Sequence, residues 1–169
     1  MSREGPPRRV APVTSDEFRR ACGRFATGVT IASVLDAQGM PHGLTVSSFT
    51  SVSLEPPLVL ICLGHAVTCI GLFRASPYFG INILAEDQRP LSERFARKGE
   101  DRFNGLAWHP GATGVPLLDR ALATIECAVR QRITSGDHDI FVAEMVGMQV
   151  SEGEPLIYFG GRYRKLALD

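Results

Sequence analysis

The segment HGLTVSSFTSVSLEPP, residues 42–57, concentrates small hydroxyl side chains within a short stretch of the chain. Serine and threonine hydroxyls both donate and accept hydrogen bonds, and they are too small to fill a core. Pro56 and Pro57 end the run, and the apolar stretch LVLICL follows at 58–63. A strand, a hydroxyl-rich turn and a second buried strand form a rigid ledge on which a planar ring can lie. An ordinary Ser/Thr-rich edge strand accounts for the same composition equally well.

The chain has 169 residues, which is enough for one domain with a sizeable core. We expect a flexible N-terminal tail over 1–14, which is basic and rich in proline, and a single domain over 15–169. The formal net charge is zero, so composition points to neither nucleic acid nor an anionic membrane as a partner. The longest apolar run is too short to span a bilayer, and the tail lacks the apolar segment of a signal peptide. These features predict a soluble cytoplasmic protein.

The four cysteines do not form a C-x-x-C pair, and the four histidines lack the spacing of metal ligands. We therefore predict no metal site, and we expect the buried free thiols of a reduced cytosolic protein. The cysteines are Cys22, Cys62, Cys69 and Cys127.

Thr14 and Glu17 have the spacing of a capping box, which predicts an amphipathic helix over 15–26 that ends before Gly28. The apolar positions of this helix are Phe18, Cys22 and Phe25. Two further short helices are predicted, one starting near Thr68 and one at 90–98.

Most of the remaining pattern predicts β-strands joined by turns, including a DAQG hairpin turn at 36–39. The strand at 123–133 is expected to be half-buried, with Ile125, Cys127, Val129 and Ile133 facing inward and Glu126, Arg130 and Arg132 facing outward. The strand at 140–150 alternates in the same way, with an apolar face of Ile140, Val142, Val146, Met148 and Val150. Residues 98–116 read as one long Gly-rich loop, a length that is usually functional or mobile. Six or seven strands and three short helices indicate an antiparallel barrel with helical additions.

Three segments together resemble the flavin reductase family with the FMN-binding split-barrel fold: GLTVSSFTSVSLEPP, GDHDIFVAEM at 136–145 and PLIYFGGRYRKL at 155–166. A fourth segment, FARKGEDRF at 95–103, fits the same family and lies in the same order along the chain. The similarity is strongest to the reductase components of two-component flavin-dependent monooxygenases. It implies a mainly β, Greek-key-like antiparallel split β-barrel with a few short helices.

The resemblance also implies an activity, namely reduction of FMN or FAD by NADH or NADPH through hydride transfer from the nicotinamide to flavin N5. It implies a homodimer that passes reduced flavin by diffusion to a partner monooxygenase. Two alternatives stay open from sequence alone. One is a flavoprotein that holds its flavin tightly and reduces another acceptor, and the other is a non-catalytic module that binds flavin or haem.

The site residues follow from the same resemblance. His138 is expected to contact the nicotinamide, although a structural role in the turn after Gly136 explains it as well. The residues expected to contact the cofactors are Thr45, Val46, Ser47, Ser48, Ser51, Cys62, Leu63, Thr68, Phe95, Lys98, Arg102, Phe103, Arg162 and Tyr163. Relatives usually carry Arg or Asn in the loop before Thr68, where this chain has GHAV, so we expect the phosphate to depend more on Lys98 and Arg102. A solvated charge cluster is the simpler reading of that pair.

Several motifs that define other enzyme classes do not occur in the sequence. There is no phosphate-binding G-x-x-x-x-G-K-[ST] loop, no strand-linked G-x-G-x-x-G fingerprint and no G-x-S-x-G nucleophile elbow. A nicotinamide nucleotide would therefore have to bind transiently on the face of the flavin, without a nucleotide-binding domain of its own.

Overall fold

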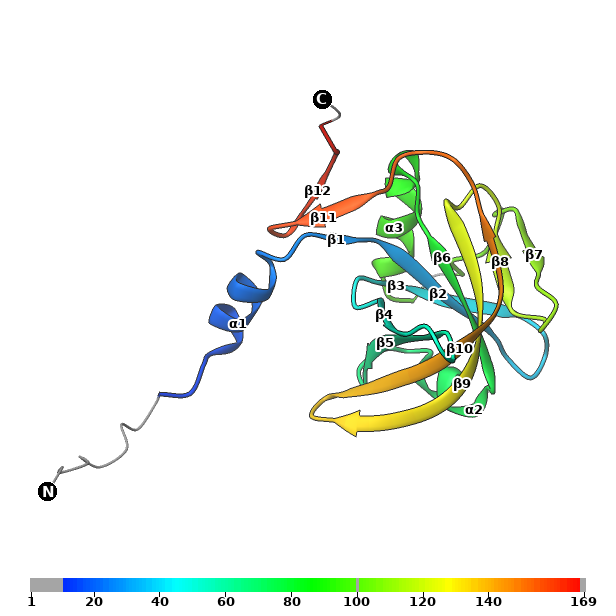
Figure 1. The fold of residues 1–169 in the computed structure, drawn as a ribbon, viewed down its shortest axis with the longest axis horizontal. Helices are drawn as coiled ribbons and strands as arrows, with labels where there is room; N and C mark the ends of the chain where they lie inside the picture. Colours follow the sequence, from blue (N-terminus) through cyan, green and yellow to red (C-terminus); the bar gives the residue numbers. More distant parts are fainter. Residues whose placement is uncertain (1–10, 100, 168–169) are drawn as a thin grey trace, which may run out of the picture.

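The computed structural model describes residues 11–99 and 101–167. Its centre is a seven-stranded antiparallel sheet in the order β3-β2-β6-β9-β10-β5-β4. The strands are β2 (Thr30–Leu35), β3 (Pro41–Val46), β4 (Thr50–Ser53), β5 (Leu58–Gly64), β6 (Tyr78–Ile83), β9 (Ala123–Ser135) and β10 (His138–Val150). The sheet curls until β3 contacts β5, which gives the barrel on the right of Figure 1. The expected mainly β, antiparallel split barrel is confirmed.

Shorter elements surround the barrel. The α-helices of the described residues are α1 (Ser15–Cys22), α2 (Ile70–Ala75) and α3 (Arg89–Ala96), and a 3₁₀ turn, η1 (Glu86–Gln88), precedes α3. A small sheet pairs β1 (Thr27–Gly28), β11 (Ile157–Phe159) and β12 (Arg162–Arg164). A second small pair joins β7 (Trp108–Pro110) to β8 (Pro116–Leu118). The segment 98–116, expected as one long loop, therefore contains β7 and the first residue of β8.

The predicted hairpin turn between β2 and β3 is confirmed. Asp36 accepts hydrogen bonds from the backbone N–H groups of Gln38 (2.9 Å) and Met40 (2.8 Å), and Gly39 has a positive φ of 77°. The Asp36 carboxylate also bonds the His42 ring (2.8 Å), and this contact, with the backbone bond from Met40, lowers the pKa of Asp36. Local turn chemistry thus fixes the register of this hairpin.

Two aromatic clusters fill the interior. Phe73, Phe79 and Phe141 pack with ring centroids 6.1–6.4 Å apart, Phe141 edge-to-face with both of the others, and each is almost fully buried. Phe95 of α3 and Phe103 form a second pair with ring centroids 5.0 Å apart, against which the half-buried Trp108 packs. Edge-to-face aromatic pairs add to the free energy gained from burial alone.

The N-terminal helix differs from its prediction. The capping box is present, since Thr14 and Glu17 exchange side-chain and backbone hydrogen bonds. The helix stops at Cys22, however, because the next N–H groups, those of Arg24 and Phe25, bond to the carbonyls of Ala21 (3.0 Å) and Cys22 (3.1 Å), only three residues back. None of its residues is buried, and Figure 1 shows α1 extending away from the barrel. Within the described chain its apolar face has no core to pack against.

In the first half of β10, the inward face is the opposite of the predicted one. The buried residues are Asp139, Phe141 and Ala143, whereas Met148 and Val150 are 67% and 69% exposed. Both faces of this strand carry apolar side chains, so alternation alone could not choose between them. Phe141 fixes the choice because its ring completes the Phe73–Phe79 cluster.

In β9, Glu126 was expected to face outward, but it is 8% exposed. Its carboxylate accepts hydrogen bonds from the N–H groups of Ala112 (3.1 Å) and Thr113 (2.7 Å) and from the Thr113 hydroxyl (2.5 Å). Burial alone would raise the pKa of Glu126, but these hydrogen bonds outweigh it and lower the pKa. The carboxylate anchors the turn between β7 and β8. On the same strand Ile133, expected inside, is exposed.

The cysteines are all free thiols, as predicted, but they are not all buried. Cys69 and Cys127 are buried, Cys62 is half-buried and Cys22 is exposed on α1. Burial raises the pKa of Cys127 to about 12 and also raises the pKa of Cys69. Both buried thiols therefore stay protonated at neutral pH.

Candidate functional site

The C-terminal end of β5 brings the hydroxyl-rich segment and the GDHDIF segment to one place. The Ser48 hydroxyl donates to the carbonyl oxygen of Cys62 (3.0 Å) and accepts from its backbone N–H (2.9 Å). On the other side of β5, Gly64 pairs with His138 at the start of β10. A Cβ on Gly64 would lie 3.4 Å from His138 Nε2, so the ring packs closely over this glycine. Segments around residues 48, 62 and 138 thus share one strand end.

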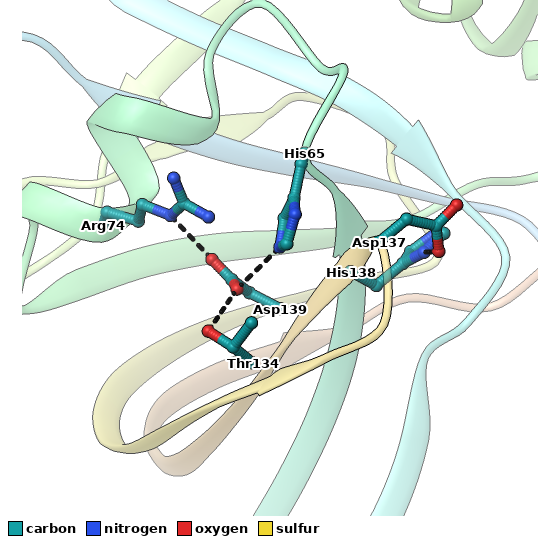
Figure 2. A network of polar contacts seen from close by, with 6 residues as sticks. All are labelled: His65, Arg74, Thr134, Asp137, His138 and Asp139. Carbon is teal, nitrogen blue, oxygen red and sulfur yellow. Dashed lines mark hydrogen bonds and ion pairs between the residues drawn. The ribbon is translucent and has the colours of Figure 1, made fainter.

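Directly beside this strand end lies a network of polar side chains around Asp139 (Figure 2). Arg74 Nε donates to Asp139 Oδ2 (2.6 Å), and the Thr134 hydroxyl donates to Oδ1 (3.0 Å). His65 Nε2 lies 3.0 Å from the same Oδ1. The Arg74 guanidinium, followed by His65 and Thr134, holds the pKa of Asp139 well below its usual range, against the opposing effect of burial. The network ties the loop after β5 to the β9–β10 hairpin.

His138 faces the other way. Consecutive strand residues point to opposite faces, so the side chain of His138 lies on the outer face of β10 while Asp139 points inward. The His138 ring is about half-exposed, and its Nδ1 lies 2.7 Å from Asp137 Oδ1. The contact with His138 lowers the pKa of Asp137. An accessible imidazole oriented by a carboxylate can donate or accept a hydrogen bond to a ligand on the outer face.

A cavity of about 670 Å³ opens on a neighbouring part of the barrel. It lies between the β2–β3 hairpin, the start of α2 and residues 99 and 101–103, and it brings together three predicted residues: Thr68, Arg102 and Phe103. Its volume falls within the range of small-molecule sites. The loop from Gly64 to Cys69 runs from the end of β5 to this cavity, so the two regions are contiguous along one loop.

Arg102 is the cation of this cavity, and its head group is held by the backbone. Nη1 donates to the Gly43 carbonyl (2.6 Å), and Nη2 donates to the Arg97 carbonyl. Its Nε is buried and has no hydrogen-bond partner among the described residues. Buried donors are rarely left without a partner, so an acceptor from a ligand fits this position.

A second set of polar contacts links the predicted Thr45 and Tyr163 through α3. The Thr45 hydroxyl donates to the Ser92 carbonyl (2.6 Å), and the Tyr163 hydroxyl is hydrogen-bonded to Ser92 Oγ (2.8 Å). The Arg89 guanidinium lies 5.0 Å from the centre of the Tyr163 ring. These contacts position β3, α3 and the β11–β12 hairpin relative to one another.

The remaining predicted residues divide by exposure. The side chains of Val46, Leu63 and Phe95 are buried in the core, so the only groups they can offer a ligand are those of the backbone. Exposed and available for contact are Ser47, Ser51, Lys98 and Arg162.

Sequence reasoning assigned no role to Asp139, Arg74 or His42, which the structure places at or beside the two regions. A signal for Asp139 did exist. Asp139 is a charged residue at the start of a strand whose next inward positions are Phe141 and Ala143. A carboxylate at a core-facing position of a strand needs a hydrogen-bond or charge partner. Nothing in the sequence indicated that the partners would be His65 and Arg74.

Among the described residues, no group of three or more His, Cys, Asp or Glu side chains is arranged to hold a metal ion. In the same part of the chain, helices of the length and apolarity required to cross a membrane are absent.

Known proteins resemble this chain along most of its length. Residues 22–167 match the family model described as "Flavin reductase like domain". The actinorhodin polyketide dimerase of Streptomyces coelicolor is 40% identical over 150 residues, which cover 88% of this chain and 85% of that protein. The reductase component of 4-nitrophenol 4-monooxygenase/4-nitrocatechol 2-monooxygenase of Rhodococcus opacus is 42% identical over 154 residues, covering 91% and 82%. Among solved structures, an NADH:FAD oxidoreductase of Streptomyces globisporus in complex with NAD and FAD fragments has a TM-score of 0.86 at 38% identity, covering 91% of this chain and 93% of that one.

Proposed function

Because the chain belongs to the family of flavin reductase-like domains, we propose that it is an NAD(P)H-dependent flavin reductase that uses FMN or FAD. The observation that carries the proposal is the likeness to the NADH:FAD oxidoreductase solved with NAD and FAD fragments, which extends over 91% of this chain. The 670 Å³ cavity supports the same conclusion, since it brings together Thr68, Arg102 and Phe103, three residues expected to contact the cofactors.

The chemistry is hydride transfer from the nicotinamide to flavin N5, which requires two stacked rings and no nucleophile from the protein. The chain's contribution is positioning. The backbone at Val46–Ser48, held to β5 through the Ser48–Cys62 bonds, offers N–H and carbonyl groups to the ring edge. Thr68 and Arg102 offer a hydroxyl and a guanidinium at the cavity. Holding reactants in a near-attack arrangement can account for much of the rate of such a reaction.

His138 is proposed as the nicotinamide contact. Its ring is accessible on the outer face of β10, and Asp137 at 2.7 Å orients it. Hydrogen bonding of this kind would favour a bound nicotinamide nucleotide without taking part in proton transfer, because hydride transfer leaves no proton to move to or from the side chain.

The product is proposed to serve a partner oxygenase. The Rhodococcus opacus relative is named as the reductase component of a monooxygenase system, and it is 42% identical to this chain. A reductase of this kind releases reduced flavin to a separate protein, so the flavin acts as a diffusible substrate.

We further propose that the protein is a homodimer. The C-terminal part of β10 carries three exposed apolar residues, which are Val146, Met148 and Val150. A contiguous exposed apolar face of this kind usually marks an interaction surface.

The direct test measures NADH and NADPH oxidation by the purified protein under air, with and without added FMN, FAD or riboflavin. Turnover that requires added flavin and saturates with it is expected for a reductase with a diffusible flavin. Full activity without added flavin would instead show a tightly bound prosthetic group, and no oxidation with any flavin would contradict the proposal.

A further inference from the structure

His65 is the first residue after β5, and the function proposed above gives it no role. Its side chain is 34% exposed and lies beside the start of β10 (Figure 2). Two polar groups of His65 reach different residues of that segment. The backbone N–H donates to the Asp137 carbonyl oxygen (2.9 Å), and ring Nε2 lies 3.0 Å from Asp139 Oδ1. His65 therefore holds both the residue before His138 and the residue after it.

The His138 ring has few contacts of its own that would fix its position. It packs over Gly64, where a Cβ would lie 3.4 Å from its Nε2. Among the described residues its hydrogen-bond partner is Asp137 Oδ1 (2.7 Å), in the same turn, and the Asp137 side chain is 94% exposed. Water weakens a contact of this kind. The position of the ring therefore depends on the backbone of residues 137–139, which His65 holds at both ends.

The contact of His65 with Asp139 has a firm anchor. The Asp139 side chain is 5% exposed, and it also accepts hydrogen bonds from Arg74 Nε (2.6 Å) and the Thr134 hydroxyl (3.0 Å). Arg74 belongs to α2 and Thr134 to β9, so two further elements hold the carboxylate in place. Hydrogen bonds to an ionised group with little water around it are stronger than those between neutral groups. The His65 ring is thus tied to a fixed point of the barrel.

We propose that His65 is a positioning residue for His138, and that it holds the His138 ring where the nicotinamide binds. The identity of that ligand rests on the proposed function. His65 acts through residues 137–139 and is assigned no contact with the reacting atoms. Loss of the His65 ring should therefore affect the use of NADH only while His138 is present. A residue that merely stabilised the loop would have the same effect with or without His138.

The test is a double-mutant cycle of His65→Ala and His138→Ala, measured as kcat/KM for NADH at a saturating concentration of flavin. His65→Ala alone should lower kcat/KM by roughly two- to tenfold, which is the range for one lost hydrogen bond. In the His138→Ala protein the same substitution should change kcat/KM by less than about twofold, because the residue through which it acts is absent. Equal losses in both backgrounds would overturn the proposal.

Two further variants control the experiment. In His65→Gln the side-chain amide can donate at the position of the imidazole Nε2, so its kcat/KM should stay within about twofold of the unaltered protein. His109→Ala removes another contact between a histidine and an aspartate, Asp119 at 2.8 Å, and should leave kcat/KM for NADH unchanged. Thermal melts should show that all variants fold. A loss in either control equal to that of His65→Ala would also overturn the proposal.

NMR of the histidine rings tests the positioning without turnover. The chain has four histidines, and substitution of each in turn assigns their ring Cε1–H resonances. His65→Ala should shift or broaden the His138 resonance, whereas His65→Gln and His109→Ala should leave it in place. An unchanged His138 resonance in His65→Ala would overturn the proposal. Failure of the proposed function would appear separately, as no NADH oxidation by the unaltered protein with any flavin, and the NMR result would remain readable.

Discussion

At the scale of single residues, the neighbours His138 and Asp139 have different roles, because their side chains lie on opposite faces of β10. His138 is accessible on the outer face of β10, whereas the Asp139 side chain is 5% exposed and holds three partners. The first residue is placed to meet a ligand. The second connects three structural elements, namely the loop after β5, helix α2 and the β9–β10 hairpin.

Substitution of His138→Ala is expected to impair use of the nicotinamide more than use of the flavin. The KM for NADH should rise by roughly two- to tenfold, because one lost hydrogen bond is worth about 0.5–1.5 kcal/mol. Steady-state kinetics with each substrate varied in turn measures this difference. His109→Ala is the matched control, because His109 is also half-exposed and bonded to an aspartate, Asp119, at 2.8 Å. An unchanged KM and rate for NADH in the His138 variant would refute the assignment.

Substitution of Asp139→Asn is expected to lower the free energy of unfolding at neutral pH. The folded-state pKa of Asp139 is lowered chiefly by Arg74, so the folded protein binds this proton less readily than the unfolded chain does. The carboxylate therefore stabilises the fold above its unfolded pKa of about 3.9, and this contribution is lost as pH falls toward the lower folded pKa. Urea unfolding gives the free energy of unfolding at neutral pH and near pH 3. The difference in this free energy between the variant and the unaltered protein should be smaller near pH 3.

The control for this experiment is Asp137→Asn. The pKa of Asp137 is also lowered, through His138, but its side chain is 94% exposed and its contact is screened by water. We expect little change in unfolding for this control. An equal difference in the free energy of unfolding at both pH values, between the Asp139 variant and the unaltered protein, would show that the charge of the carboxylate does not contribute to stability.

At the scale of secondary-structure elements, close packing shows most clearly at glycines. In β6 a Cβ on Gly80 would lie 2.5 Å from Ser33 Oγ and 2.8 Å from the Pro116 carbonyl oxygen. That glycine lets β8 approach the main sheet, where Ser33 also donates to the Pro116 carbonyl (2.5 Å). In α2, by contrast, a Cβ on Gly71 would meet nothing within 4 Å.

The two glycines predict opposite effects of the same substitution. Gly80→Ala should destabilise the protein by roughly 1–3 kcal/mol, because the barrel must shift to admit the methyl group. Gly71→Ala should be neutral or stabilise by up to about 1 kcal/mol, because alanine loses less backbone entropy in a helix. Chemical denaturation of both variants measures the difference. Equal destabilisation of the two variants would contradict a steric requirement specific to Gly80.

At the scale of the whole molecule, the barrel is well packed inside while parts of its outer surface remain apolar. Met148 and Val150 on β10, and Phe18 and Phe25 at the N-terminal arm, are each more than half exposed. These apolar side chains lie on faces that no described residue covers. A second copy of the chain is the proposed partner.

Sedimentation analysis is expected to give the mass of a dimer, and Met148→Glu should shift it toward the monomer, because a buried charge without a partner opposes association. Gln149→Glu provides the control, since it adds the same charge to the neighbouring position of the same strand, on the other face. A monomer mass for the unaltered protein, or equal behaviour of the two variants, would contradict the proposed interface.

Much of the architecture could be predicted from local pattern. The capping box at Thr14, the β2–β3 turn and the positions of β2, β5, β6 and the β9–β10 pair follow from turn chemistry and periodicity over a few residues. The motif order also led to the family, because four weak signals in sequence order are more specific than any one. Local signals succeed where neighbouring residues supply the deciding interaction.

Other features were decided only by tertiary structure. Alternation with a period of two cannot say which face of β10 turns inward when both faces are apolar, and only Phe141 meeting two distant phenylalanines settles it. Likewise, the partners of Glu126 and Asp139 come from other elements, so their burial could not be seen in their own strands. The β11–β12 hairpin meets the end of α1 only because β1 pairs with β11 and the Gly160 N–H donates to the Gly23 carbonyl. By itself, the sequence determined the secondary-structure elements and their order. Contacts between distant segments decided which side chains face one another, because burial and charge pairing depend on neighbours in space.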